Sequence, residues 1–227
     1  GGGLSVDRIV TIDGPSGSGK GTIARLLADR LGWHCLDSGA LYRLVGVAAD
    51  RAGVAFDDPA ALAAIARGLP AAFAGDRVLL DGEDVGTLIR SEQAGNLASR
   101  VAAVPAVRDA LLEWQRSQAR EPGLVADGRD MGTVVFPTAP VKVFLTASPE
   151  ERALRRHNQL LEKGFTASLP NLVAEIRERD ERDRNRAVAP LKAPAAALEI
   201  ESTALSIEEV LDRVLERVRS AFPDPVV

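Results

Sequence analysis

The sequence predicts an α/β protein whose parallel β-sheet is covered by helices on both faces, and three observations lead to this prediction. Short apolar runs recur along the chain, each next to a segment with helical periodicity, and strands that alternate with helices favour such a sheet. The first strand leads directly into a glycine-rich turn and a helix. The chain has 227 residues, and a chain of this size buries roughly 70% of its unfolded surface, enough for a substantial core.

Five apolar runs are the expected strands. They are residues 8–13, 33–36, 124–126, 141–147 and 196–200. The last helix has the clearest helical signal, because Ser206 and Glu209 form a capping-box pair before one apolar stripe. The stripe consists of Ile207, Val210, Leu211, Val214, Leu215, Val218 and Phe222, and the helix is expected to end before Pro223.

Two segments interrupt the alternation of strands and helices. Residues 52–105 predict a β-hairpin that turns at Gly75-Asp76 or at Asp81-Gly82, within an inserted lobe. Residues 157–170 form a polar segment between two arginine-bearing helices. Because this segment contains the glycine of residues 163–165, we expect it to be a mobile cover.

Residues 14–22, with the sequence GPSGSGKGT, have the pattern of a phosphate-binding loop. Glycines allow successive N–H groups to turn inward around an anion, and the helix that follows adds the positive end of its dipole. Lys20, one of four lysines against twenty-four arginines, supplies a mobile charge for the phosphates. The alternative is an ordinary glycine-rich turn. We expect a nucleoside triphosphate to be bound by Gly14, Pro15, Ser16, Gly17, Ser18, Gly19, Lys20, Gly21 and Thr22.

Two further positions are candidates for Mg²⁺ binding. A hydroxyl usually follows the lysine of such a loop directly, but here a glycine intervenes, so Thr22 would contact Mg²⁺ directly or through water. Asp127 follows the third strand, where phosphate-loop enzymes place a metal-positioning carboxylate. Arg129 and Asp130 add a cation and an acceptor on the same rim. The alternative is a tight turn in which these two side chains pair with each other.

The second strand also ends in polar side chains. Ser38, Tyr42 and Arg43 follow it directly, and ligands of open α/β sheets gather at the carboxyl ends of the strands. A hydroxyl and a guanidinium group one turn apart could hold the phosphate of a second substrate. The alternative is a capped helix start, with Asp37 or Ser38 as the cap.

Arginines crowd both sides of the polar segment. They are Arg152, Arg155 and Arg156 before it, and Arg177, Arg179, Arg182, Arg184 and Arg186 after it. The second group is matched by five acidic residues, which excludes a basic stripe for nucleic acid. However, Arg179, Arg182, Asp183 and Arg186 fall on one helix face that could close over phosphates. About half of the arginines are expected to form only surface ion pairs.

Composition limits the partners and the compartment. A net charge of −4 argues against nucleic acid or an anionic membrane as the main partner. Cys35 is the only cysteine, so no disulfide can form within the chain, which suits a reducing cytosol. The chain contains no long apolar run or export signal. We therefore expect a cytoplasmic monomer that acts on small molecules. His34 and His157 are expected to be structural.

Four motifs together resemble the bacterial cytidylate kinase family. They are GPSGSGKGT at 14–22, LDSGALYR at 36–43, ADGRDMGTVVFP at 126–137 and ERDERDRNRAVAPL at 178–191. The resemblance covers nearly everything from Val6 to the last helix. It implies a doubly wound core with a five-stranded parallel sheet (residues 6–51, 106–156 and 187–227), a monophosphate-binding lobe (52–105) and a lid (157–186). It also implies transfer of the γ-phosphoryl group of ATP, bound with Mg²⁺, to CMP or dCMP.

The same resemblance implies roles for individual residues. The acceptor phosphate would be held by Ser38, Arg43, Arg129 and Arg186, beside Tyr42. Arg179 and Asp183 would reach the CMP sugar, and the cytosine would be read by Ser99, Arg108 and Asp130. A carboxylate can accept a hydrogen bond from the exocyclic amino group that uracil lacks, so UMP should be penalised. The catalytic group would comprise Lys20, Asp127, Arg129 and Arg186.

Other functions remain open from the residues alone. A kinase for UMP, shikimate or dephospho-coenzyme A is the nearest alternative. A GTP switch should carry an Asn-Lys-x-Asp motif, yet none of the four asparagines is followed by lysine. A nucleic-acid-dependent ATPase is disfavoured by the acidic balance.

Overall fold

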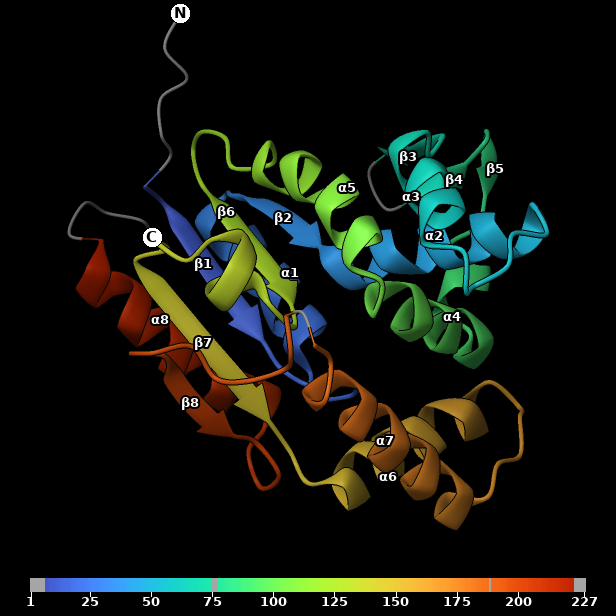
Figure 1. Cartoon of the computed structure of the whole chain (residues 1–227). Coiled ribbons are helices and arrows are strands. Elements are labelled where there is room, and N and C mark those ends of the chain that lie inside the picture. Colours follow the sequence, from blue (N-terminus) through green and yellow to red (C-terminus); the bar gives the residue numbers. More distant parts are fainter. Residues whose placement is uncertain (1–6, 75–76, 188, 223–227) are drawn as a thin grey trace, which may run out of the picture. The chain divides into compact units, whose positions relative to one another are not determined.

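The computed structural model describes residues 7–74, 77–187 and 189–222, and its central feature is a five-stranded parallel sheet in the order β2–β6–β1–β7–β8 (Figure 1). The strands are β2 (His34–Asp37), β6 (Leu124–Gly128), β1 (Ile9–Asp13), β7 (Val141–Thr146) and β8 (Leu198–Glu201). In the register, Asp13 lies opposite Gly128 on β6 and Phe144 on β7. The predicted α/β fold and all five predicted strands are therefore confirmed.

Two helices cover one face of this sheet. They are α1 (Lys20–Leu31) and α8 (Ile207–Ala221), whose apolar side chains join those of β1 and β7 in one buried cluster (Figure 1). The predicted capping box of α8 is present, since Ser206 Oγ accepts from the Glu209 N–H at 3.1 Å and Glu209 Oε1 accepts from the Ser206 N–H at 3.2 Å. One member of the predicted stripe is wrong, because Ile207 is 52% exposed in the first turn. Pro223 lies outside the described residues.

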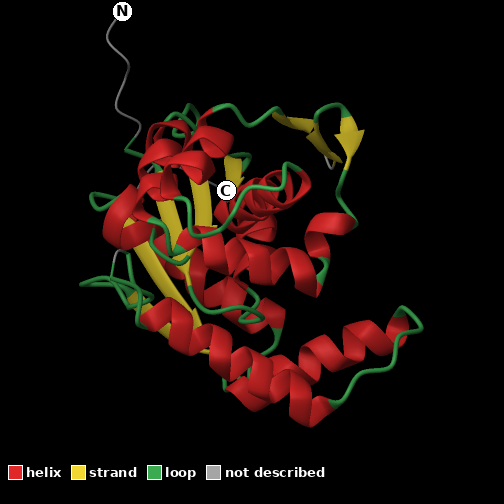
Figure 2. Ribbon diagram, turned by 45° about the vertical axis from the view of Figure 1, so that its right-hand side comes forward, coloured by secondary structure: helices red, strands yellow, loops and turns green. Residues whose placement is uncertain are grey.

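A helical hairpin follows β7 and consists of α6 (Pro149–Glu162) and α7 (Leu169–Arg184) (Figure 2). Its apolar contact is small: Ala153, Leu172 and Ile176 form the buried cluster. The predicted polar segment is shorter than expected, because α6 continues through residues 157–162 and Pro170 lies in the first turn of α7. Gln, Leu and Glu at these positions are good helix formers, and proline is tolerated in a first turn.

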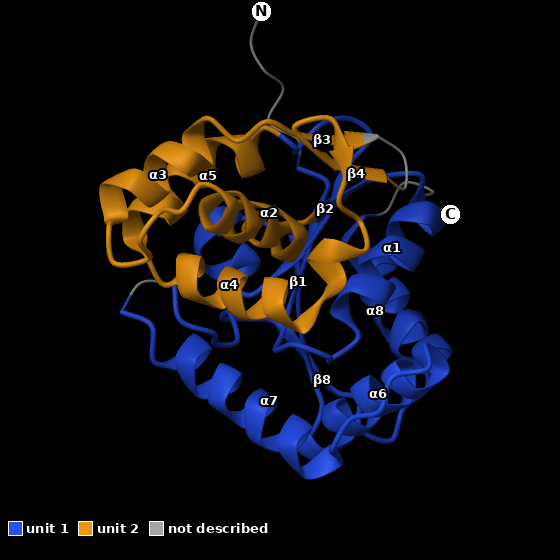
Figure 3. Cartoon of the chain, turned by 90° about the vertical axis from the view of Figure 1, so that its right-hand side faces the viewer, with its two compact units in different colours: residues 1–36, 118–227 blue, residues 37–117 orange. Residues whose placement is uncertain are grey.

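The chain divides into two compact units, residues 1–36 with 118–227 and residues 37–117 (Figure 3). The second unit contains α2 (Ser38–Arg51), α3 (Pro59–Arg67), β3 (Ala71–Ala74), β4 (Arg77–Leu80), β5 (Glu83–Asp84), a 3₁₀ turn η1 (Leu88–Arg90), α4 (Glu92–Ala102) and α5 (Pro105–Arg116). Helices α2 and α4 approach closely at Gly46, where a Cβ would lie 2.9 Å from Leu97 Cβ.

The small sheet of the second unit extends the predicted hairpin. Strands β3, β4 and β5 pair antiparallel in that order. The turn between β4 and β5 is Asp81-Gly82, with φ of 51° and 80°, which is the left-handed geometry of a tight hairpin turn. The other candidate turn, Gly75-Asp76, lies outside the described residues.

Candidate functional site

The phosphate loop connects β1 to α1, and its glycines have geometric reasons to be glycine. Gly17 and Gly19 have φ of 72° and 92°, in the left-handed region that side chains rarely adopt. A Cβ on Gly14 would lie 2.1 Å from the Leu145 carbonyl oxygen. Lys20 is the first residue of α1, and Thr22 is half-buried in the same turn. The N–H groups at the start of α1 and the lysine therefore belong to one concave, positively polarised turn.

Asp13 at the carboxyl end of β1 fixes the neighbouring loop, a role that the sequence analysis missed. Its side chain is fully buried, and its two oxygens accept hydrogen bonds from the Met131 and Gly132 N–H groups, each at 2.8 Å. Burial raises the pKa of this carboxyl from 3.8 to about 7, although the two N–H groups favour the ionised form. The sequence did contain one signal for this role, because Asp13 is an acidic residue at the end of an apolar strand, directly before the phosphate loop.

The rim at the end of β6 is polar and mostly buried. Asp127 and Asp130 are each 3% exposed. Arg129 turns to α7, where its Nε lies 2.6 Å from Asp183 Oδ2. The loop continues into η2 (Met131–Val135), whose first N–H groups are those held by Asp13. The backbone of the phosphate loop and this rim are joined directly, since the Gly14 N–H donates to the Gly128 carbonyl at 3.2 Å.

Two arginines predicted to bind the acceptor phosphate, Arg129 and Arg186, meet at one carboxylate. Asp183 is fully buried. Its Oδ2 forms an ion pair with Arg129, and its Oδ1 lies 3.2 Å from Arg186 Nη1. Arg186 also donates to the Ala189 carbonyl through Nε and Nη2. Arg179, one helical turn before Asp183, is buried as well. The structure thus brings Arg129, directly after β6, and Arg186, just after α7, to one buried carboxylate.

Two arginines of α6 contact the phosphate loop, a role that the sequence analysis did not assign to them. Arg152, 3% exposed, donates to Ser16 of the phosphate loop and binds Asp180 of α7 through both Nη atoms. Arg155 donates to the carbonyls of Gly17, at 3.3 Å, and Ser18, at 3.4 Å. The sequence analysis placed both arginines in the crowded group without assigning them to the loop. Nothing in their spacing distinguishes them from surface arginines.

The remaining predicted residues lie in the second unit. Ser38 is buried in the first turn of α2, and Asp37 is the cap, accepting from the Ala40 N–H at 2.9 Å. Arg108 is buried, donates to the Ala102 carbonyl at 2.7 Å and lies 5.2 Å from the centre of the Tyr42 ring. Of two further predicted residues, Arg43 on α2 is half-buried and Ser99 on α4 is buried. Helices α2, α4 and α5 carry these predicted residues.

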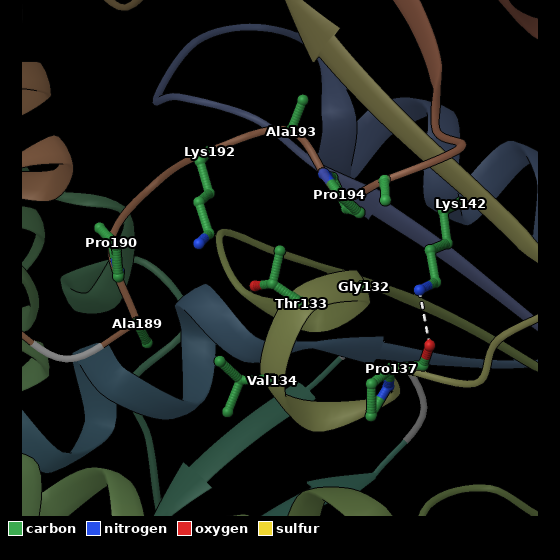
Figure 4. A pocket seen from close by; sticks show the side chains of 11 residues that line it. Gly132, Thr133, Val134, Pro137, Lys142, Ala189, Pro190, Lys192, Ala193 and Pro194 are labelled. Carbon is green, nitrogen blue, oxygen red and sulfur yellow. Dashed lines mark hydrogen bonds between the residues drawn. The ribbon is translucent and has the colours of Figure 1, made fainter.

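A cavity of about 450 Å³ lies elsewhere in the first unit, between η2 and the segment 189–195 (Figure 4). Lys142, whose Nζ donates to the Pro137 carbonyl at 2.6 Å, lines it together with Lys192 and Thr133. The residues predicted to bind nucleotide do not contribute to its lining. The cavity borders the candidate site at Ala189, whose carbonyl accepts from Arg186.

The predicted Mg²⁺ ligands are two oxygen-bearing residues of the first unit, Thr22 and Asp127. Across residues 7–74, 77–187 and 189–222, no three His, Cys, Asp or Glu side chains gather into a metal-binding group. Mg²⁺ usually keeps several waters and is bound by one or two protein oxygens plus substrate phosphates; of the two predicted ligands, Asp127 is buried and Thr22 is half-buried. Within the described part of the chain, no helix combines the length and hydrophobicity needed to cross a membrane.

A glycine-rich loop at the centre of a parallel sheet, next to a rim of carboxylates and guanidinium groups, is the arrangement of a P-loop kinase. The model of one family, described as cytidylate kinase, matches residues 10–220. The chain belongs to the cytidylate kinase family.

Curated relatives agree with this assignment over nearly the whole chain. The cytidylate kinase of Aeromonas salmonicida is 57% identical over 220 residues, which cover 95% of this chain and 96% of the relative. That of Pseudomonas syringae pv. tomato is 59% identical, covering 92% and 94%. Among solved structures, an uncharacterized protein from Eubacterium ventriosum has a TM-score of 0.53 at 12% identity, covering 94% of this chain and 99% of that one. This last likeness concerns the fold alone.

Proposed function

We propose that this cytidylate kinase transfers the γ-phosphoryl group of ATP to CMP or dCMP by holding the donor on the phosphate loop and the acceptor on the rim of β6 and α7. The strongest support is the buried Asp183, which holds the guanidinium groups of Arg129 and Arg186 next to each other. Two fixed cations at one place suit a phosphate dianion. The rim that carries Arg129 is also hydrogen-bonded to the phosphate loop.

The donor half of the proposal uses residues 14–22. Loop N–H groups and Lys20 would bind the phosphates of ATP, and the start of α1 would add its dipole. Asp127 and the Thr22 hydroxyl would hold Mg²⁺, which neutralises charge on the β- and γ-phosphates when it is bound. Lys20 would then follow the transferred group with its flexible chain.

The acceptor half follows the family resemblance. Arg129 and Arg186 would bind the acceptor phosphate, together with Ser38 and Arg43. Arg179 and Asp183 would contact the sugar. The cytosine would be read by Ser99, Arg108 and Asp130, because a carboxylate can accept from the exocyclic amino group. Residues 52–105 would then act as the monophosphate-binding lobe and residues 157–186 as the lid.

No general base is required for this reaction, because a phosphate oxygen of CMP is already an anionic nucleophile at neutral pH. The protein chiefly has to align donor and acceptor and surround the transferred group with positive charge. It also has to exclude water, since water would compete with CMP for the γ-phosphoryl group. The buried Arg179 of the lid is suited to that task.

The experiment is a coupled assay with a panel of acceptors at equal concentration, comprising CMP, dCMP, UMP, shikimate and dephospho-coenzyme A. CMP should have the highest kcat/KM, with dCMP accepted and UMP strongly disfavoured. An Asp130→Asn variant should narrow the difference between CMP and UMP. If CMP is not the best acceptor, the assignment of the base site is wrong.

We further propose that the protein is cytoplasmic, in line with its single cysteine, and that it is a monomer. Light scattering after size-exclusion chromatography should give a mass near 24.0 kDa. A stable dimer would contradict this proposal.

A further inference from the structure

We infer that Arg152 and Asp180 form a positioning pair that sets the shape of the phosphate loop and ties it to the helix carrying the acceptor residues. The inference rests on the proposed binding of ATP to residues 14–22. It concerns neither a phosphate ligand nor a group that touches CMP. Both residues lie in the first unit, at the base of the α6–α7 hairpin.

The guanidinium group of Arg152 is almost saturated by the protein. Its Nε donates to the Ala147 carbonyl at 3.0 Å, and its Nη1 donates to the Ser16 carbonyl at 3.0 Å and to Asp180 Oδ1 at 2.9 Å. Nη2 lies 2.5 Å from Asp180 Oδ2. Four of the five N–H donors of arginine are thereby used. Arg152 therefore acts on the loop that would bind ATP and not on ATP itself.

The phosphate loop rests directly on this side chain. A Cβ added to Gly17 would lie 3.2 Å from Arg152 Cβ, so the loop backbone packs against the arginine stem where φ is +72°. The Ser16 carbonyl is anchored to its head. Moving the guanidinium group would therefore release a carbonyl of the loop and alter the direction of the neighbouring N–H groups, on which phosphate binding depends.

Asp180 supplies the second half of the link. It is 4% exposed and sits on α7 directly after Arg179 and three residues before Asp183. A two-point contact with a guanidinium group fixes both distance and orientation. The rotation of α7, and with it the place of Arg179 and Asp183, is thus set relative to the phosphate loop.

The test compares buried and exposed ion pairs on the same two helices. Asp180→Asn and Arg152→Lys should each raise the Kd of a fluorescent ATP analogue and the KM for ATP by about fivefold or more, as expected for coupled sites. KM for CMP should rise as well, because α7 is released. The matched controls are Glu150→Gln and Arg177→Gln. These residues form an ion pair between α6 and α7 in which both side chains are 59% exposed, and both variants should match the wild type.

A double variant, Arg152→Met with Asp180→Leu, separates positioning from stability. Replacing a buried ion pair by apolar side chains often restores or raises stability, so its thermal midpoint should recover while ATP binding stays weakened. If ATP binding recovers together with the midpoint, or if Asp180→Asn binds the analogue like the wild type, the pair is only a stabilising element. Should a single variant fail to fold, the double variant carries the test. Failure of the wild type to bind the analogue would instead contradict the proposed ATP site.

Discussion

The phosphate loop and the α6–α7 hairpin belong to the same unit, but they are fixed by different forces. The loop follows a fully buried strand within the large apolar cluster of the sheet, and its course depends on glycine backbone geometry. The hairpin has a small apolar cluster, and buried ion pairs such as Arg152 with Asp180 connect it to its surroundings. Loss of a charge should therefore disturb the hairpin, whereas backbone changes should disturb the loop and its rim.

The largest effect is expected in the loop. Lys20→Ala should lower kcat by about 100- to 1000-fold with every acceptor. The substitution removes a positive charge that stabilises the transition state of phosphoryl transfer. Circular dichroism should be unchanged. Lys142→Ala is the matched control, since this lysine donates to the Pro137 carbonyl and is not among the predicted nucleotide-binding residues. Equal activity of the Lys20 variant and the wild type would exclude the proposed donor site.

The next effect tests the hairpin. Asp183→Ala leaves Arg129 and Arg186 without the carboxylate that orients them, so KM for CMP should rise by about 10- to 100-fold, as expected when charged contacts are lost. Stability should fall by about 3 kcal/mol, because the buried Arg186 and the half-buried Arg129 lose their anion. Glu178→Ala, at an exposed carboxylate of the same helix, is the control. The division into donor and acceptor residues would be wrong if the Asp183 variant lost ATP binding.

A third test uses the pH dependence of the free energy of unfolding, to which Asp13 at the end of β1 contributes. The pKa of Asp13 is raised in the folded protein from 3.8 to about 7 by burial, so the folded state binds the proton more tightly than the unfolded state does. This carboxyl therefore contributes to stability at low pH, and the contribution is lost as the pH rises through 7. Between pH 4 and pH 7 it amounts to about 3 kcal/mol.

Urea unfolding at several pH values measures this contribution. Asp13→Asn should flatten the pH profile of the free energy of unfolding over that interval. KM for CMP in the wild type should rise below pH 7, as the protonated carboxyl loses its hold on the Met131 and Gly132 N–H groups. An unchanged profile in the variant would show that Asp13 does not titrate there.

The smallest effects compare two glycines. A Cβ on Gly132 would lie 2.8 Å from Thr11 Oγ1 and 2.9 Å from Pro194 Cγ, so Gly132→Ala should cost about 1–3 kcal/mol and raise KM for CMP. Gly164, in the hairpin turn, has open space around it but a φ of +81°. Gly164→Ala should cost about 1 kcal/mol and leave the kinetics unchanged. Thermal unfolding and steady-state kinetics distinguish the two variants, and a kinetic defect in the second would show that the turn itself takes part in binding.

The sequence predicts the elements that depend on local patterns. The five strands, the glycines of residues 14–22 and the cap of α8 follow from periodicity, backbone freedom and side-chain reach. The family resemblance also named Arg129, Asp183 and Arg186, which the structure brings together. What these residues contact in the complete reaction stays a prediction.

Other features depend on tertiary packing and leave little local signal. Arg152 and Arg177 look alike in the sequence, because both are arginines on charged helices. In the fold one is buried against Asp180, while the other is an exposed partner of Glu150. Asp13 likewise acquires its role only when β6 places the N–H groups of Met131 and Gly132 beside it. Burial of a charged group is decided by which elements meet, and a single sequence does not record that.

The most direct measurement follows ADP formation from ATP and Mg²⁺, first alone and then with CMP, together with the yield of CDP. If both nucleotides are enclosed, ADP should form slowly from ATP alone. The rate of ADP formation should rise on the order of 100-fold or more when CMP is added, and one CDP should form for each ADP. Rapid ATP hydrolysis without CMP, or ADP formation without CDP, would contradict the account.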